Sequence, residues 1–301
     1  MNLSMSSSAL SEIRDILSAF LQQCQIPYPR DIDLSTSFRD ACYADATRRG
    51  FDLELMARPL DVGIAITDTM YRHLKNDSTR VFIALWTCLV THIDDYYETY
   101  ADGLADFFNR FLRQEPQLYS AFDHVVALFR ETPQHWGTIA SNLITTTELD
   151  FLTPSIIDKE IEGMEVRITA VSYPHFTRRM AGISRAYAAF GIPPELDLTT
   201  WIQVLPDFIA YIDHANDLFS FYKEELAGET VNFVSLYANA HGIPKLDALK
   251  RLAEETAQCY QRGSQLLQSH PEAWKAFRAT CAGYIKFHAS SPRYKLDQLN
   301  L

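Results

Sequence analysis

Apolar residues recur three and four positions apart along most of this 301-residue chain. Alternating runs of β-branched and polar residues, which are typical of half-buried strands, are hard to find. Because the observed spacing places apolar side chains on one face of a helix, it predicts a nearly all-α protein. Helices are expected at residues 9–25, 35–48, 60–75, 78–100, 104–113, 117–130, 134–150, 155–169, 173–190, 198–225, 231–241, 245–268 and 271–289.

Several of these expected helices are apolar all round, which predicts that they pass through the middle of a large bundle. Single glycines, Gly103, Gly191 and Gly242, stand where helices are expected to end. No internal repeat, low-complexity tract or linker divides the chain. We therefore expect one helical domain over residues 51–301, with residues 1–50 forming an N-terminal helical segment that packs on its core.

Composition excludes several classes of function. The chain has 27 Lys and Arg against 38 Asp and Glu, a formal net charge of −11. A general nucleic-acid binder or a protein that binds anionic membranes needs a basic surface, so no nucleic-acid partner is expected. The 11 glycines are scattered singly, so a glycine-rich phosphate loop is absent.

The cysteines and the apolar runs bear on localisation. The five cysteines are odd in number, lie far apart and form no CxxC pair, as expected for buried free thiols in a reducing compartment. The longest apolar run, Val81 to Ile93, is too short for a membrane span, and the N-terminus lacks the basic start of a signal peptide. A cytoplasmic protein without a membrane span is expected, and a homodimer is left open.

The first candidate site follows that apolar run, at Asp94-Asp-Tyr-Tyr-Glu98. On a continuous helix Asp94 and Glu98 share a face, while Asp95 lies about 100° away. Carboxylates gathered at a helix C-terminus repel each other and oppose the helix dipole, which indicates a bound cation. The alternative is a solvated helix end.

The second candidate site is the segment Asn216-Asp-Leu-Phe-Ser-Phe-Tyr-Lys-Glu-Glu225. Asn216, Ser220 and Glu224 are spaced four residues apart and form one stripe of an amide oxygen, a hydroxyl and a carboxylate. Hard ions such as Mg²⁺ prefer oxygen ligands of this kind. An ordinary amphipathic helix explains the charges but does not explain three oxygen donors in line with an apolar stripe.

Together the two sites predict an apolar cavity with metal ligands at its mouth. Counting back along each helix face, Val90 and Trp86 precede Asp94, and Ile212 and Phe208 precede Asn216. If the helices face each other, Trp86 and Phe208 form part of the cavity wall. Such a site would hold an apolar molecule by its body and an anionic head through Mg²⁺.

An anionic head also needs cationic partners. Candidates are Lys223, the neighbours Arg178 and Arg179, and Arg293, which Tyr294 follows. Each of them alone is better explained by a surface salt bridge.

These motifs together resemble those of class I terpene cyclases. Asp94-Asp-Tyr-Tyr-Glu98 resembles the aspartate-rich DDxx(D/E) motif, Asn216-Asp-x-x-Ser-x-x-Lys-Glu224 resembles the NSE triad, and Arg293-Tyr294 resembles the late RY pair. The segments NDLFSFYKEE and SPRYKL most resemble those of the fungal trichodiene synthase-like group. The resemblance covers roughly residues 60–300.

The resemblance implies a single helical domain around an apolar cavity that binds three Mg²⁺ ions and an isoprenoid diphosphate. It makes Asp94 and Glu98 ligands on one side, and Asn216, Ser220 and Glu224 ligands on the other. It also implies catalytic and diphosphate-binding roles for Asp94, Arg178, Lys223, Arg293 and Tyr294. Arg178 and Gly182 resemble a diphosphate sensor with its helix break, although Ala181 replaces a linking acid and Arg179 competes for the role.

The implied activity is ionisation of farnesyl diphosphate, cyclisation of the carbocation to a sesquiterpene hydrocarbon or alcohol, and release of pyrophosphate. Two alternatives stay open. A chain-elongating prenyl diphosphate synthase would need a second aspartate-rich motif where this chain has its Asn, Ser and Glu. A noncatalytic isoprenoid-binding protein would release no pyrophosphate.

Overall fold

The computed structural model describes residues 6–30, 32–161 and 164–301, and within these ranges it contains helices and no strand. The predicted all-α fold is confirmed. The α-helices are α1 (Ser7–Cys24), α2 (Thr36–Arg49), α3 (Leu53–Met70), α4 (Asp77–Asp95), α5 (Ala101–Arg113), α6 (Ser120–Glu131), α7 (Thr138–Phe151), α8 (Pro154–Glu160), α9 (Tyr173–Ala181), α10 (Ser184–Gly191), α11 (Leu198–Trp201), α12 (Leu205–Ala227), α13 (Phe233–His241), α14 (Lys245–Leu266) and α15 (Pro271–Ser290). The 3₁₀ helices are η1 (Thr132–Gln134), η2 (Pro292–Tyr294) and η3 (Leu296–Leu299).

Helix α12 lies in the interior of the bundle, against α10, α14 and α15. Helix α3 packs against α4 on one side and α15 on the other. The fully buried side chains of α4 and α12 include large aromatic rings such as Trp86 and Phe208. The expectation that apolar helices run through the middle of the bundle is therefore met by these two helices.

Two glycines allow α3 to contact its neighbours at backbone distance. A β-carbon at Gly63 would lie 2.2 Å from the carbonyl oxygen of Ala84 on α4, and one at Gly283 of α15 would lie 2.2 Å from that of Thr69. No side chain fits into these gaps. The positions of α4 and α15, which both carry candidate site residues, depend on these two contacts.

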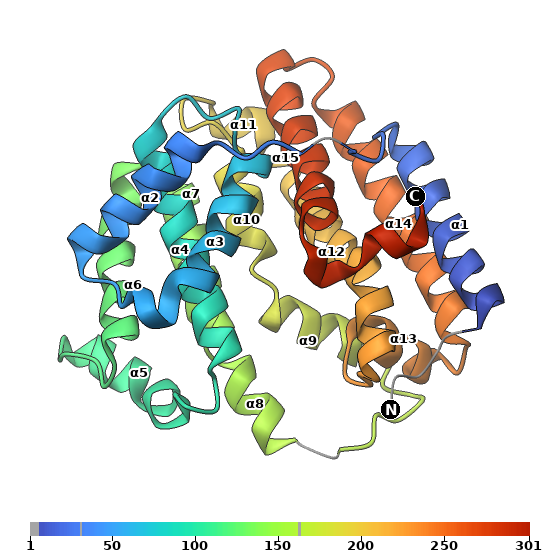
Figure 1. The fold of residues 1–301 in the computed structure, drawn as a ribbon, viewed down its shortest axis with the longest axis horizontal. Coiled ribbons are helices and arrows are strands. Elements are labelled where there is room, and N and C mark those ends of the chain that lie inside the picture. Colours follow the sequence, from blue (N-terminus) through green and yellow to red (C-terminus); the bar gives the residue numbers. More distant parts are fainter. Residues whose placement is uncertain (1–5, 31, 162–163) are drawn as a thin grey trace.

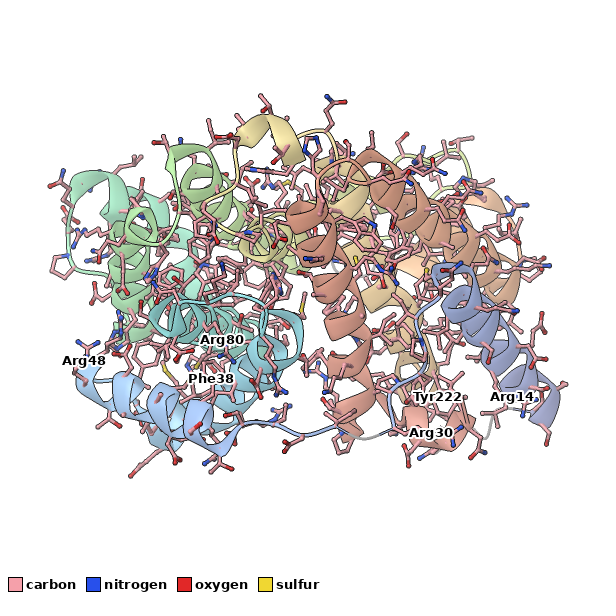
Figure 2. All side chains as sticks on the ribbon, turned by 90° about the horizontal axis from the view of Figure 1, so that it is seen from above. Arg14, Arg30, Phe38, Arg48, Arg80 and Tyr222 are labelled. Atoms are coloured by element: carbon pink, nitrogen blue, oxygen red, sulfur yellow. The ribbon has the colours of Figure 1, made fainter. Side chains whose placement is uncertain are left out.

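A buried carboxylate of α3 connects this helix with α2 and α4. Asp68 is 1% exposed and accepts hydrogen bonds from Arg80 of α4 at 2.8 Å and from Arg72 at 2.6 Å. The backbone N–H of Ser35, the N-cap of α2, donates to the same carboxylate. The Arg80 guanidinium also lies 4.3 Å from the ring centre of Phe38, and Figure 2 shows these two residues side by side. Buried charge is thus paired.

The first two helices lie on opposite sides of the molecule (Figure 1). Helix α1 packs on α14, α12 and η3, whereas α2 packs on α3 and α4. Residues of both helices belong to the buried core. The division into a segment 1–50 and a domain 51–301 stays a prediction.

Several expected helices differ from the structure. The expected helix 173–190 is two helices, interrupted at Gly182. The helix expected at 198–225 is also divided, because Pro206 begins a new helix at its second position. The helix expected at 155–169 ends at Glu160, and residues 164–171, which are rich in β-branched side chains, lie outside any helix.

Helix α4 ends earlier than expected, at Asp95 instead of near residue 100. The chain turns over residues 96–100, where the N–H of Tyr96 donates to the carbonyl of His92 and caps the helix. Glu98 therefore does not continue the helix that carries Asp94. The expectation that these two carboxylates share a helix face is wrong.

The cysteines and the apolar helices are the features that bear on the expected localisation. All five cysteines are free and buried. Among the described helices, not one combines the length and the apolar character that crossing a membrane requires.

Replacing Gly283 with alanine is expected to destabilise the fold. Alanine normally favours a helix over glycine by about 1 kcal/mol, but here its methyl group would displace the backbone of α3. We expect a loss of about 1–3 kcal/mol in the free energy of unfolding, measured by urea denaturation. The control is Gly137→Ala at the N-cap of α7, where the added carbon meets no atom within 4 Å and only the N-cap preference for glycine is lost, about 0.5–1 kcal/mol. An unchanged midpoint for Gly283→Ala would contradict the backbone contact.

Candidate active site

A cavity of about 260 Å³ lies between α4, α9, α12 and α15. It is lined by residues that are up to 232 positions apart in sequence, from Val62 to Tyr294. The polar and charged lining residues are Thr91, Asp94, Arg178, Ser184, Asp213, Asn216, Ser220, Lys223, Glu224 and Arg293. The predicted site residues of the two motifs thus lie in one place, with the exception of Glu98.

Helix α12 supplies the stripe of oxygen donors. Asn216, Ser220 and Glu224 all line the cavity, as their four-residue spacing predicts. Ser220 is 3% exposed. Burial raises the pKa of Glu224, and the Lys223 ammonium, 3.0 Å from its carboxylate, offsets part of that rise. A second positive charge would stabilise this carboxylate further.

Helix α4 supplies Asp94 at the other side of the cavity. Asp94 lines the cavity together with Val90 and Thr91, which lie one turn earlier on the same helix. Glu98, in contrast, is exposed in the turn that follows α4 and accepts a hydrogen bond from the Tyr97 hydroxyl at 3.3 Å. It is not among the residues that line the cavity, because α4 ends one residue after Asp94.

Arg178 is bound to two carboxylates of α12. Its Nε lies 2.9 Å from Asp217 and its Nη1 3.2 Å from Asp213, and Nη2 donates to the Asp213 carbonyl oxygen at 2.8 Å. Burial raises the pKa of both carboxyl groups, that of Asp217 to about 7, and the charge of Arg178 offsets the effect only in part. Arg178 lines the cavity, whereas its neighbour Arg179 is exposed and does not.

The helix break after Arg178 makes this arrangement possible. A β-carbon at Gly182 would lie 2.5 Å from the Asp213 carboxylate and 3.0 Å from the Arg178 guanidinium. A glycine at this position thus lets the backbone pass directly beside the ion pair. Ala181, which stands where the resemblance expects a linking acid, also lines the cavity, and the acids that contact Arg178 come from α12 instead.

The remaining predicted cations and the tyrosine also lie at the cavity. Lys223 is on α12, and Arg293 and Tyr294 are on η2, which packs against α12 and α15. Tyr294 is buried against the ring of Phe287, and burial raises its pKa to about 12. Arg293 is exposed, so it faces both the cavity and solvent.

The prediction of the cavity wall is correct for the helical turn nearest to Asp94 and Asn216 and wrong for the turn before it. Val90 and Ile212 line the cavity, but Trp86 and Phe208, one turn deeper, are fully buried and are not among the lining residues. The Tyr187 ring of α10 lies 6.1 Å from Trp86, and the Phe277 ring lies 4.9 Å from Phe208. Aromatic side chains from other helices fill the space into which these two residues were expected to project.

The aromatic lining comes instead from helices that the sequence motifs do not include. Beside Tyr294, its members are Phe151 of α7, Tyr187 of α10, and Tyr284 and Phe287 of α15. Tyr284 and Phe287, three positions apart and just before Arg293-Tyr294, share one helix face, so this pair had a signal in the sequence. Phe151 and Tyr187 had none.

A buried acid lies beneath this wall, on α7. Glu148 is completely buried, and its carboxyl oxygens make no regular hydrogen bond to any described residue. Burial raises the pKa of Glu148 well above the usual value for a glutamate, and the neighbouring Trp86 indole lowers it slightly. An isolated buried carboxyl group is neutral under such conditions.

The donor chemistry of the cavity suits a hard cation and an anion together. Among the described residues, no group of three or more His, Cys, Asp and Glu side chains is arranged so that it could hold a metal ion. The oxygen-bearing side chains of Asp94, Asn216, Ser220 and Glu224 border the same space, however, and two of them are neutral. Oxygen donors of this kind fit Mg²⁺, while Arg178, Lys223 and Arg293 supply donors for phosphate oxygens.

Comparison with known proteins gives matches over almost the whole chain. A family model described as trichodiene synthase matches residues 64–300. An alpha-cuprenene synthase of Coprinopsis cinerea is 32% identical over 293 residues, which cover 96% of this chain and 90% of the relative. A monoterpene synthase of Postia placenta is 31% identical over 306 residues, covering 97% and 88%.

Solved structures share the fold. A linalool/nerolidol synthase from Streptomyces clavuligerus, in complex with 2-fluorogeranyl diphosphate, superposes with a TM-score of 0.66 at 15% identity, covering 88% of this chain and 98% of the other. A hedycaryol synthase in complex with nerolidol gives a TM-score of 0.61 at 16% identity, with the same coverage. The fold is therefore the all-α fold of class I terpene synthases.

The stability of the protein is expected to depend on pH through Glu148. Because its folded pKa is raised above the ordinary value of 4.5, the folded state holds a proton that the unfolded state releases. Stability is therefore highest below that value and falls as pH rises toward the folded pKa. Glu148→Gln keeps the size of the side chain but cannot ionise. Its free energy of unfolding should therefore decrease less steeply with pH than that of the unchanged protein, with a difference in slope of up to about 1.4 kcal/mol per pH unit.

Urea denaturation at several values between about pH 5 and 8 measures this difference. Asp40→Asn is the control, because Asp40 is exposed in the middle of α2. Parallel stability profiles for Glu148→Gln and the unchanged protein would show that Glu148 is not buried as a neutral acid.

Proposed function

Because the chain belongs to the trichodiene synthase family, and is thus an enzyme of the terpene synthase class, we propose that it cyclises farnesyl diphosphate with the help of Mg²⁺. The product is a sesquiterpene hydrocarbon or alcohol, and pyrophosphate is released. One observation carries the proposal: oxygen donors and three cationic side chains line the same cavity as five aromatic rings.

The polar end of the cavity supports a role in ionising the substrate. Asp94, Asn216, Ser220 and Glu224 would hold Mg²⁺, which would draw negative charge away from the leaving diphosphate. Glu98 would first have to move toward the cavity to join them. Arg178, Lys223 and Arg293 would bind diphosphate oxygens and stabilise the charge that develops as the carbon–oxygen bond breaks. The hydroxyl of Tyr294, which burial keeps protonated, can donate a hydrogen bond to the same group.

The aromatic part of the cavity supports a role in protecting the cation. Phe151, Tyr187, Tyr284 and Phe287 line it, and each ring face can stabilise a desolvated cation by roughly 1–2 kcal/mol. Apolar side chains such as Val90 and Ile212 exclude water that would otherwise capture the carbocation. No carboxylate is needed to remove the last proton, because the released pyrophosphate can accept it.

The substrate length and the setting of the enzyme are part of the proposal. Farnesyl diphosphate is the expectation from the family resemblance, while one relative is named a monoterpene synthase, so a ten-carbon substrate is the main competitor. The five free and buried thiols support a reducing compartment, and we place the enzyme in the cytoplasm. The homodimer stays a prediction.

The purified protein is expected to release pyrophosphate and a volatile C15 product from farnesyl diphosphate only when Mg²⁺ is present. The test is incubation with C10, C15 and C20 diphosphates, with and without EDTA, followed by mass spectrometry of the volatiles. Release that needs isopentenyl diphosphate would indicate chain elongation, and no release from any substrate would indicate a binding protein. A C10 product would shift the substrate assignment to geranyl diphosphate.

Glu224→Gln is expected to lower kcat by roughly 10²-fold or more, since it removes a ligand charge at the reacting end of the substrate. The matched control is the adjacent Glu225→Gln. Glu225 pairs with Lys245 at 2.6 Å and does not line the cavity, so kcat should stay within about threefold. Circular dichroism confirms folding of both variants. Equal activities of the two variants would remove Glu224 from the metal site.

A further inference from the structure

The orientation of the Asn216 side chain is determined by a histidine of another helix. His288 of α15 is completely buried. Its Nδ1 lies 2.8 Å from the carbonyl oxygen of Tyr284, one turn earlier on the same helix, and its Nε2 lies 3.2 Å from Nδ2 of Asn216. The ring thus connects the backbone of α15 with a side chain of α12.

The two contacts together determine where the hydrogen atoms are. A carbonyl oxygen can only accept a hydrogen bond, so Nδ1 of His288 must carry the proton that it donates to Tyr284. A neutral imidazole has a single N–H, which leaves Nε2 with a lone pair. The NH₂ group of Asn216 is therefore the donor to Nε2, and its amide oxygen is the end that points away from the ring.

The surroundings of the ring favour the neutral form. The side chain is packed against the rings of Tyr284 and Tyr294, with ring centres 4.5 Å away in both cases. Complete burial between aromatic rings disfavours a charged imidazolium. A histidine in these surroundings acts as a hydrogen-bond acceptor with a fixed direction.

We propose that His288 is a positioning residue, which holds the amide oxygen of Asn216 toward the cavity as a cation ligand. The inference rests on the proposed function, because it takes Asn216 as a metal ligand. The two ends of an amide have nearly the same shape but opposite partial charges. Without the acceptor at position 288 the group can turn over, and its NH₂ would then face the cation and repel it.

Metal binding in the absence of turnover tests this role. Mn²⁺ replaces Mg²⁺ as the probe, and its binding to the full chain with inorganic pyrophosphate is followed by electron paramagnetic resonance. His288→Phe keeps an aromatic ring but removes the acceptor, and we expect Mn²⁺ affinity to fall about 10–100-fold. An affinity equal to that of the unchanged protein would overturn the proposal.

A histidine elsewhere, whose side chain is 7% exposed, provides the matched control. His135 bonds to Thr79 at 3.0 Å and to Glu131 at 3.3 Å and does not line the cavity. His135→Phe removes a comparable set of buried polar contacts, so it measures the general effect of such a change. We expect its Mn²⁺ affinity to stay within about threefold. A decrease equal to that of His288→Phe would overturn the proposal.

A double substitution separates orientation from simple proximity. The carboxylate in Asn216→Asp has two equivalent oxygens, so it has no wrong orientation to prevent. In that background His288→Phe should weaken Mn²⁺ binding by less than about threefold, instead of 10–100-fold. The full loss in both backgrounds would mean that His288 acts in another way.

The unmodified protein offers a test that needs no variant to fold. With ¹⁵N-labelled histidine, NMR correlation through two bonds distinguishes the two neutral forms of each ring. His288 is expected to carry its proton on Nδ1, with an unprotonated Nε2. A proton on Nε2 would overturn the proposal.

Failure of this inference is distinguishable from failure of the proposed function. If the unchanged protein binds no Mn²⁺ with pyrophosphate and releases none from any prenyl diphosphate, the proposed function and the inference both fall. If it binds Mn²⁺ and turns over substrate while His288→Phe does the same equally well, only the role of His288 is refuted.

Discussion

The contact of one guanidinium with two carboxylates of α12 determines how this site is arranged. Arg178 lies at the end of α9, and its bonds to Asp213 and Asp217 connect that end to the central helix. Asp213 and Asp217 share the single charge of Arg178, which offsets only part of the effect of their burial. The pKa of Asp217 is therefore raised to about 7. This unfavourable burial of charge occurs at the cavity, and ionisable groups with perturbed pKa values are characteristic of functional sites.

Other features follow from the geometry of this contact. The backbone passes beside the ion pair at Gly182, which has no β-carbon, and this is where the predicted helix 173–190 is divided. The division directs α10 back into the bundle, and Tyr187 from α10 lines the cavity. Electrostatic pairing at the mouth and aromatic packing below it are thus connected through a single break in the helix.

The aromatic side chains decide how deep the cavity extends. Tyr187 lies against Trp86, and the Phe277 ring lies against Phe208, so the cavity ends one helical turn above the two residues that the sequence placed in its wall. The same packing completely buries Trp86 and Glu148. The cavity is therefore bounded on its inner side by closely packed side chains.

Residue spacing alone was sufficient for the all-α class and for the stripe of Asn216, Ser220 and Glu224, because both depend only on the period of a helix, which is a local property. It was sufficient also for placing Val90 and Ile212 in the wall. It failed for Glu98, since whether α4 continues past Asp95 is decided by where the chain turns, and for Trp86 and Phe208, whose surroundings are supplied by distant helices.

Only the tertiary structure decided which of Arg178 and Arg179 faces the cavity, and that the acids which hold Arg178 come from α12 and not from position 181. The same is true of His288, whose ring reaches Asn216 from 72 positions away. The physical reason is the same in each case. A helix period determines which side chains share a face, but the partner of a buried polar group depends on how helices far apart in the sequence are packed.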